Sequence, residues 1–122
     1  DQAWVHCQSA HRYFQLNADD WYLARIENLL ALLLETDQKI DDALVMAASA
    51  RARFERLGMP SMVAMVDDNT SSLHLTRGDP EAALEVSSRA LAFELGSGKL
   101  QHAVSSRINI ARALSALGRH AE

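Results

Sequence analysis

Cys7 and His11 are the first residues of this sequence whose types and spacing could support chemistry. They are four residues apart, so on a helix a thiol and an imidazole would share one face and could hold a metal together. Metal sites in proteins need more than two ligands, and no third ligand accompanies this pair. We therefore expect no metal site and no cofactor.

Adjacent carboxylates are the second candidate for chemistry. Neighbouring residues on a helix diverge by roughly 100°, so such a pair cannot work as general acid and general base by itself. We interpret most of these carboxylates as helix caps and solvated faces, and we also expect a solvated face for the nearby arginines. The carboxylate pairs are Asp19-Asp20, Asp41-Asp42 and Asp67-Asp68, and the arginines are Arg51, Arg53 and Arg56.

Motifs of enzymes are missing from the sequence. It contains no GxSxG, no phosphate-binding glycine loop and no dinucleotide fingerprint. His74 has no motif partner, and we expect it to pack at a seam between helices. We therefore predict that the chain is not an enzyme.

Composition favours a helical protein. The chain has 122 residues, 48% of them apolar, with only two prolines and 6% aromatics, which favours closely packed helices over sheet. The formal charge of -4 gives no basic face for nucleic acid, so we expect no nucleic-acid contact by this segment. The longest apolar run, the six residues 29–34, is far short of the roughly 20 that span a membrane. Cys7 is the single cysteine, which fits the reducing cytoplasm, and we predict a cytoplasmic protein.

An internal repeat organises the chain. Ala3, Ala43 and Ala83 lie 40 residues apart, and each is followed by another Ala seven residues later. Glycines that can end helices recur at the same spacing, in the pairs Gly58 and Gly98 and Gly78 and Gly118, whereas Gln38 stands where the first copy would have its Gly. We predict helices over residues 2–17, 20–36, 39–57, 60–76, 80–95 and 99–117, joined by connections so short that consecutive helices must be antiparallel.

The spacing of small residues resembles the tetratricopeptide repeat in its long, 40-residue variety. Ser71-Gly78-Ala83-Ala90 matches all four small positions of that repeat, and Ala31-Gln38-Ala43-Ala50 matches three. The resemblance implies an all-α fold of about six helices, stacked as antiparallel hairpins in a right-handed superhelix. It divides a single domain, residues 1–122, into a half repeat (1–18), two full repeats (19–58 and 59–98) and a second half repeat (99–122). Helical repeats of the HEAT type are the structural alternative.

The resemblance also implies a concave groove lined by the first helix of each repeat. Asparagine amides there can hydrogen-bond a peptide backbone, and arginines can pair with carboxylate or phosphate, although solvated side chains are the ordinary reading of both. The predicted ligand-binding residues are Arg25, Asn28, Asp68, Asn69, Ser72, Asn109 and Arg112. Apolar residues among the groove positions include Leu32, Met65 and Ile108.

These features predict an interaction or sensing module of a larger regulatory or signalling protein, of the kind found in bacteria. Its partner would be a protein or peptide, or another domain of the same chain. The alternative is a small-molecule effector sensor of a bacterial transcription regulator, which a tight pocket with aromatic walls would favour. Trp4 and Met46 could line such a pocket, although we expect them in the core. The sequence begins without Met, so we expect a piece of a longer protein, and we expect self-association through the terminal helices.

Overall fold

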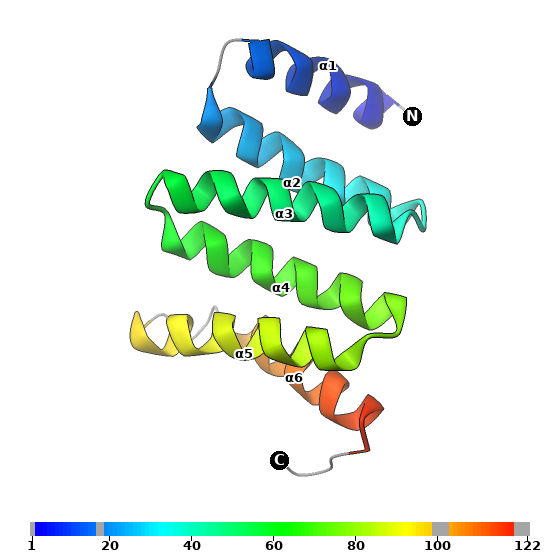
Figure 1. Ribbon diagram of the computed structural model, residues 1–122, viewed down its shortest axis with the longest axis vertical. Coiled ribbons are helices and arrows are strands. Elements are labelled where there is room, and N and C mark those ends of the chain that lie inside the picture. The colour runs from blue at the N-terminus through cyan, green and yellow to red at the C-terminus, as the bar shows by residue number, and fades with distance from the viewer. Residues whose placement is uncertain (1, 17–18, 99–102, 119–122) are drawn as a thin grey trace. The chain divides into compact units, whose positions relative to one another are not determined.

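The computed structural model describes residues 2–16, 19–98 and 103–118, and these residues form six α-helices and no strand (Figure 1). The helices match the predicted ones closely, except that the expected start of the last helix at residue 99 lies outside the described residues. Within the described part of the chain, no helix is long and apolar enough to cross a membrane. The helices are α1 (Gln2–Leu16), α2 (Asp20–Thr36), α3 (Ile40–Arg56), α4 (Pro60–Arg77), α5 (Pro80–Gly96) and α6 (Ala103–Ala116).

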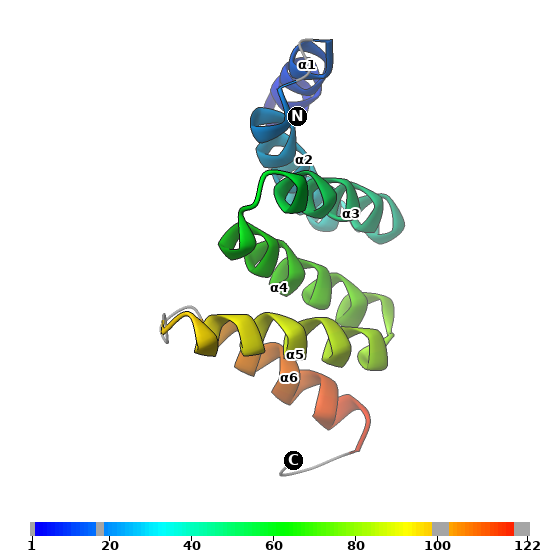
Figure 2. The same cartoon turned by 60° about the vertical axis from the view of Figure 1, so that its left-hand side comes forward.

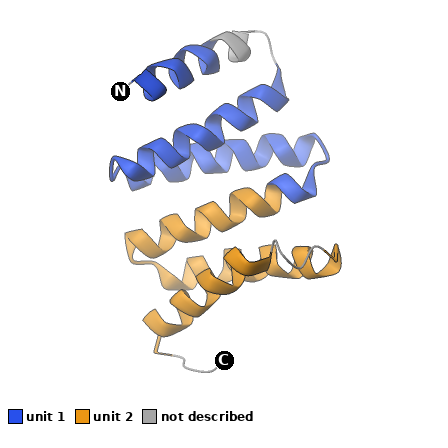
Figure 3. Ribbon diagram, turned by 180° about the vertical axis from the view of Figure 1, so that it is seen from behind, with its two compact units in different colours: residues 1–62 blue, residues 63–122 orange. Residues whose placement is uncertain are grey.

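The chain divides into two compact units, residues 1–62 and residues 63–122 (Figure 3). Unit 1 contains α1, α2, α3 and the first turn of α4, and unit 2 contains the rest of α4 with α5 and α6. Within each unit, consecutive helices pack side by side and run in opposite directions (Figures 1 and 2). The fold is therefore all-α and consistent with a helical repeat, while the superhelix and the four-part repeat division stay predictions.

Aspartates begin two of the helices as the sequence indicates. The carboxylate of Asp79 accepts a hydrogen bond from the backbone N–H of Ala82 at 3.2 Å, and Pro80 occupies the first turn of α5. Asp19 caps α2 in the same way through the N–H of Tyr22 at 3.3 Å. Each cap satisfies a backbone donor that the helix itself leaves without a partner.

Left-handed residues end the helices at the predicted glycines. Gly58 and Gly78 have φ angles of 68° and 90°, and the residue after each donates a backbone hydrogen bond to the last helical turn. Gln38 takes the same conformation, with a φ of 64°, and Lys39 N–H donates to Leu34 O at 2.8 Å. The first copy therefore makes the same helix ending without the glycine.

Small residues lie in the core where the spacing predicts close contact between helices. All six of the predicted positions are buried, which lets the backbones approach closely. In unit 2 the Ser71 hydroxyl donates to the Ala83 carbonyl at 2.9 Å, directly linking α4 to α5. The six are Ala31, Ala43, Ala50, Ser71, Ala83 and Ala90.

Candidate functional site

A buried carboxylate links the three helices of unit 1. Glu27 of α2 is only 3% exposed. Its Oε1 accepts hydrogen bonds from Ser49 Oγ at 2.8 Å and from Arg53 Nε at 2.9 Å, both on α3, and its Oε2 lies 3.0 Å from His11 Nε2 on α1. Because a buried charge is costly without partners, these contacts stabilise the packing of all three helices around Glu27.

Arg53 divides its guanidinium between two carboxylates of α2. Besides Glu27, it donates through Nη1 to Asp20 Oδ1 at 2.6 Å, and Arg56 approaches the same oxygen at 3.5 Å. The hydrogen bond from Arg53 lowers the pKa of Asp20 below its ordinary value. Burial of Arg53 opposes its charge, but the hydrogen bonds to Glu27 and Asp20 outweigh burial and raise the pKa of Arg53. The predicted solvated face is therefore wrong for Arg53.

Unit 2 buries two adjacent carboxylates. Asp67 is 2% exposed and meets the guanidinium of Arg89 from α5 through both of its oxygens at 3.3 Å. Asp68 is 9% exposed and accepts from Ser106 Oγ of α6 at 2.6 Å. Reading the pair Asp67-Asp68 as a cap or a solvated face was wrong, because α4 directs both side chains toward neighbouring helices.

Ser106 connects Asp68 to a second buried carboxylate, that of Glu94 on α5. Its hydroxyl oxygen lies 2.5 Å from Glu94 Oε1 as well as 2.6 Å from Asp68 Oδ1. A serine hydroxyl has one proton to donate, so the second contact needs a proton on one of the carboxyl groups. Burial, together with the charges of Glu94 and Asp67, raises the pKa of Asp68 to about 6 against the opposing hydrogen bond from Ser106.

The seven predicted groove residues occupy different environments. Asp68 and Asn109 are buried, and Asn109 Nδ2 donates to the backbone carbonyl of Asp68 at 3.0 Å, which ties α6 to α4. Arg25 is exposed, with its guanidinium carbon 4.8 Å from the centre of the Trp21 ring. Whether these residues bind a ligand stays a prediction. Arg25 and Asn28 belong to unit 1, and the members in unit 2 are Asp68, Asn69, Ser72, Asn109 and Arg112.

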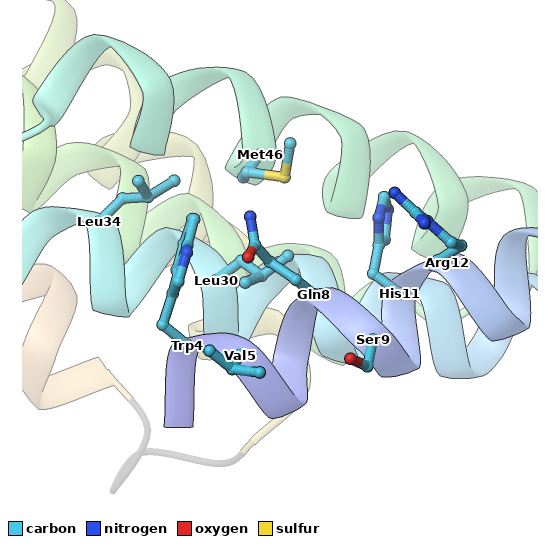
Figure 4. A pocket seen from close by; sticks show the side chains of 9 residues that line it. All are labelled: Trp4, Val5, Gln8, Ser9, His11, Arg12, Leu30, Leu34 and Met46. Carbon is cyan, nitrogen blue, oxygen red and sulfur yellow. The ribbon is translucent and has the colours of Figure 1, made fainter. Parts of the chain in front are cut away.

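A pocket of about 580 Å³ opens between the helices of unit 1 (Figure 4). In Figure 4, Trp4 and Leu34 lie at one end of it and His11 and Arg12 at the other, with Met46 of α3 between them. The predicted core role of Trp4 is thus only partly correct, since its ring is half-buried and faces the pocket. The full lining is Trp4, Val5, Gln8, Ser9, His11, Arg12, Leu30, Leu34 and Met46.

Cys7 and His11 do not form the start of a metal site. Burial raises the pKa of the Cys7 thiol, and His11 is engaged with Glu27. Within the described ranges of the chain, no group of three or more metal-ligating side chains comes together. In unit 2, the Nδ1 atom of His74 is buried without a hydrogen-bond partner among the described residues, which fits the predicted packing of this side chain at a seam.

No family model matches this chain, and no curated protein sequence matches it. The resemblance to tetratricopeptide repeats therefore stays a prediction from the spacing of small residues.

Sequence reasoning missed the buried ionic groups and the pocket. One pattern could have indicated the first of these, because Glu27 and Asp67 lie 40 residues apart and so hold the same position in successive repeats. A carboxylate that recurs on the helix face occupied by core residues indicates a buried charge with partners. The pocket has no such pattern, because its walls come from three helices whose facing side chains only the fold brings together.

Proposed function

We propose that this chain is a non-catalytic interaction module of a larger regulatory protein, which binds a peptide segment or a neighbouring domain through the first helices of its repeats. The observation that carries the proposal is the exposure of large apolar side chains at predicted groove positions. Ile108 of α6 is 53% exposed, Leu32 of α2 39% and Met65 of α4 38%. Such side chains are the usual anchors of a protein interface.

The polar neighbours of these apolar side chains suit a peptide ligand. Arg25 and Arg112 are exposed on the same helices and can pair with carboxylates of a partner. Covering one large apolar side chain contributes roughly 1.5–3 kcal/mol, so a few such anchors supply a useful affinity. Binding would be non-covalent, since the ionisable groups buried in each unit are engaged with one another.

Photo-crosslinking tests this proposal. A benzophenone amino acid placed at Ile108 or Leu32 should crosslink to a partner in lysate of the source cells. The matched control is the same amino acid at Val45 of α3, a second-helix position that is 63% exposed. Products that form only from Ile108 and Leu32, and that disappear when Arg112→Glu or Arg25→Glu is added, support the proposal. Equal crosslinking from Val45 would contradict it.

A second function, the sensing of a small-molecule effector, is favoured by the pocket of unit 1. Its wall includes the Trp4 ring, which matches the aromatic wall expected of such a site. Both functions place the chain in a regulatory protein of the cytoplasm, for which the support is the resemblance to bacterial regulators together with the single cysteine. The two functions use different surfaces of unit 1, so separate experiments can test them.

A further inference from the structure

The pocket of unit 1 differs chemically from one end to the other. At one end, the indole of Trp4 and the side chain of Leu34 form apolar walls, and Leu30 and Met46 continue this surface toward the middle (Figure 4). At the other end lie His11 and Arg12. No acidic side chain is among the lining residues, so the field inside the pocket favours a negative group at the Arg12 end.

Arg12 is the charged group available to a ligand in this pocket. It is exposed, and no carboxylate among the described residues forms an ion pair with it. His11 beside it is held by Glu27, whose other oxygen accepts from Ser49 and Arg53. The Glu27 carboxylate is therefore satisfied by its own partners and leaves the Arg12 guanidinium for another anion.

The volume of the pocket fits a small molecule. At about 580 Å³ it lies in the usual range of ligand pockets, roughly 300–1,000 Å³. Such sites combine apolar walls with a few polar groups that fix orientation, and here Gln8 adds an amide between the two ends (Figure 4). A single guanidinium matches one carboxylate through two parallel hydrogen bonds.

We propose that this pocket binds a small organic carboxylate with an aromatic body, its ring against Trp4 and Leu34 and its carboxylate on the Arg12 guanidinium. The proposal rests on the sensing function and names the ligand class and the site. Gln8 orients the ligand between the two ends. Because α1, α2 and α3 all line the pocket, an occupant would contact three helices at once and stabilise their packing.

Trp4 can report its own pocket. The chain has two tryptophans, Trp4 and Trp21, so a Trp21→Phe background leaves Trp4 as the one indole. The probes are 4-phenylbutyrate and its neutral amide, 4-phenylbutyramide, which share the ring and chain and differ in charge. We expect a saturable change of Trp4 emission with the carboxylate and about tenfold weaker binding of the amide.

The arginine variants decide whether Arg12 causes that preference. Arg12→Gln should weaken binding of the carboxylate about tenfold and leave the amide unchanged, so that the two probes bind equally. Arg112→Gln, the same change at an exposed arginine of unit 2, should keep the full preference. Far-UV circular dichroism of each variant checks that the helices remain.

Two results would overturn the inference, and they separate it from the sensing function on which it rests. If both probes move Trp4 emission with equal affinity in the parent protein, the pocket binds ligands but the anionic class is wrong, and the sensing function survives. If neither probe changes Trp4 emission up to about 10 mM, above the millimolar range of weak ligands, both fall together.

Discussion

The two units bury a carboxylate at the same repeat position but compensate it differently. Glu27 in unit 1 and Asp67 in unit 2 lie 40 residues apart, and each meets an arginine of the following helix. Unit 2 buries two more carboxyl groups, Asp68 and Glu94, to which no cationic side chain among the described residues is hydrogen-bonded. Unit 1 therefore depends on ion pairing, whereas unit 2 depends on a shared proton.

Removal of the unit 1 carboxylate should have the largest effect. Glu27→Ala leaves His11 and Ser49 without their partner and Arg53 with Asp20 alone, at a cost of about 3 kcal/mol in the free energy of unfolding. Both tryptophans lie in unit 1, so urea unfolding followed by tryptophan fluorescence measures this unit. The control is Glu85→Ala on the exposed face of α5, with an expected change near zero. A loss for Glu27→Ala below about 1 kcal/mol would contradict the ionic role.

Unit 2 should respond to charge removal in the opposite direction. The folded-state pKa of Asp68, about 6, is above the ordinary value of 3.8. The folded state therefore binds this proton more tightly than the unfolded state does. The stability that results is fully present below about pH 4 and is lost as the pH rises through 6.

Asp68→Asn tests that direction because an amide cannot ionise. We expect the variant to be more stable than the parent at pH 7 by about 1–2 kcal/mol, after allowance for solvent screening, and to lose this advantage near pH 4. Hydrogen exchange of α4 and α6 amides measures unit 2 directly. Asp20→Asn in unit 1 is the counterpart. Its lowered pKa stabilises the fold above about pH 4 and is lost on acidification, so this change should destabilise at pH 7. Equal signs for the two variants would remove the distinction between the units.

Ser106 should matter less than either carboxylate. Ser106→Ala removes the hydroxyl between Asp68 and Glu94, with an expected loss of about 1 kcal/mol. Because the hydrogen bond from Ser106 lowers the pKa of Asp68, its loss should move that pKa further upward. Carboxyl carbon NMR titration measures the shift, and Ser105→Ala, at an exposed neighbour, serves as the control. An unchanged titration of Asp68 would show that Ser106 does not bridge the two groups.

Local sequence signals predict the helices well, whereas the buried ionic contacts needed the fold. Asp79 and Gly78 act on backbone atoms a few residues away, so their effect can be derived without knowledge of distant contacts. The partners of Glu27 and Asp68 lie 12 or more residues away along the chain, on helices whose facing sides depend on packing. Charge alone favoured solvent exposure for Arg53 and Asp68, and packing overrode it.

The helix endings offer the smallest and most local test of the difference between the units. Gln38 in unit 1 and Gly78 in unit 2 hold equivalent positions 40 residues apart, and both have positive φ angles, 64° and 90°. A side chain in this left-handed conformation crowds the following carbonyl, which glycine avoids. Gln38→Gly should therefore stabilise unit 1 by about 0.5 kcal/mol, since the greater freedom of glycine in the unfolded chain offsets part of the relief.

The reverse exchange in unit 2 completes this test. Gly78→Gln should destabilise by a similar amount, because space around Gly78 is open and backbone strain is the remaining cost. Thermal unfolding of each variant against the parent, read by circular dichroism, gives the two signs. A gain from Gln38→Gly without a loss from Gly78→Gln would mean that Gln38 is strained by its own surroundings. Opposite shifts of similar size would show that the ending itself sets the cost in both units.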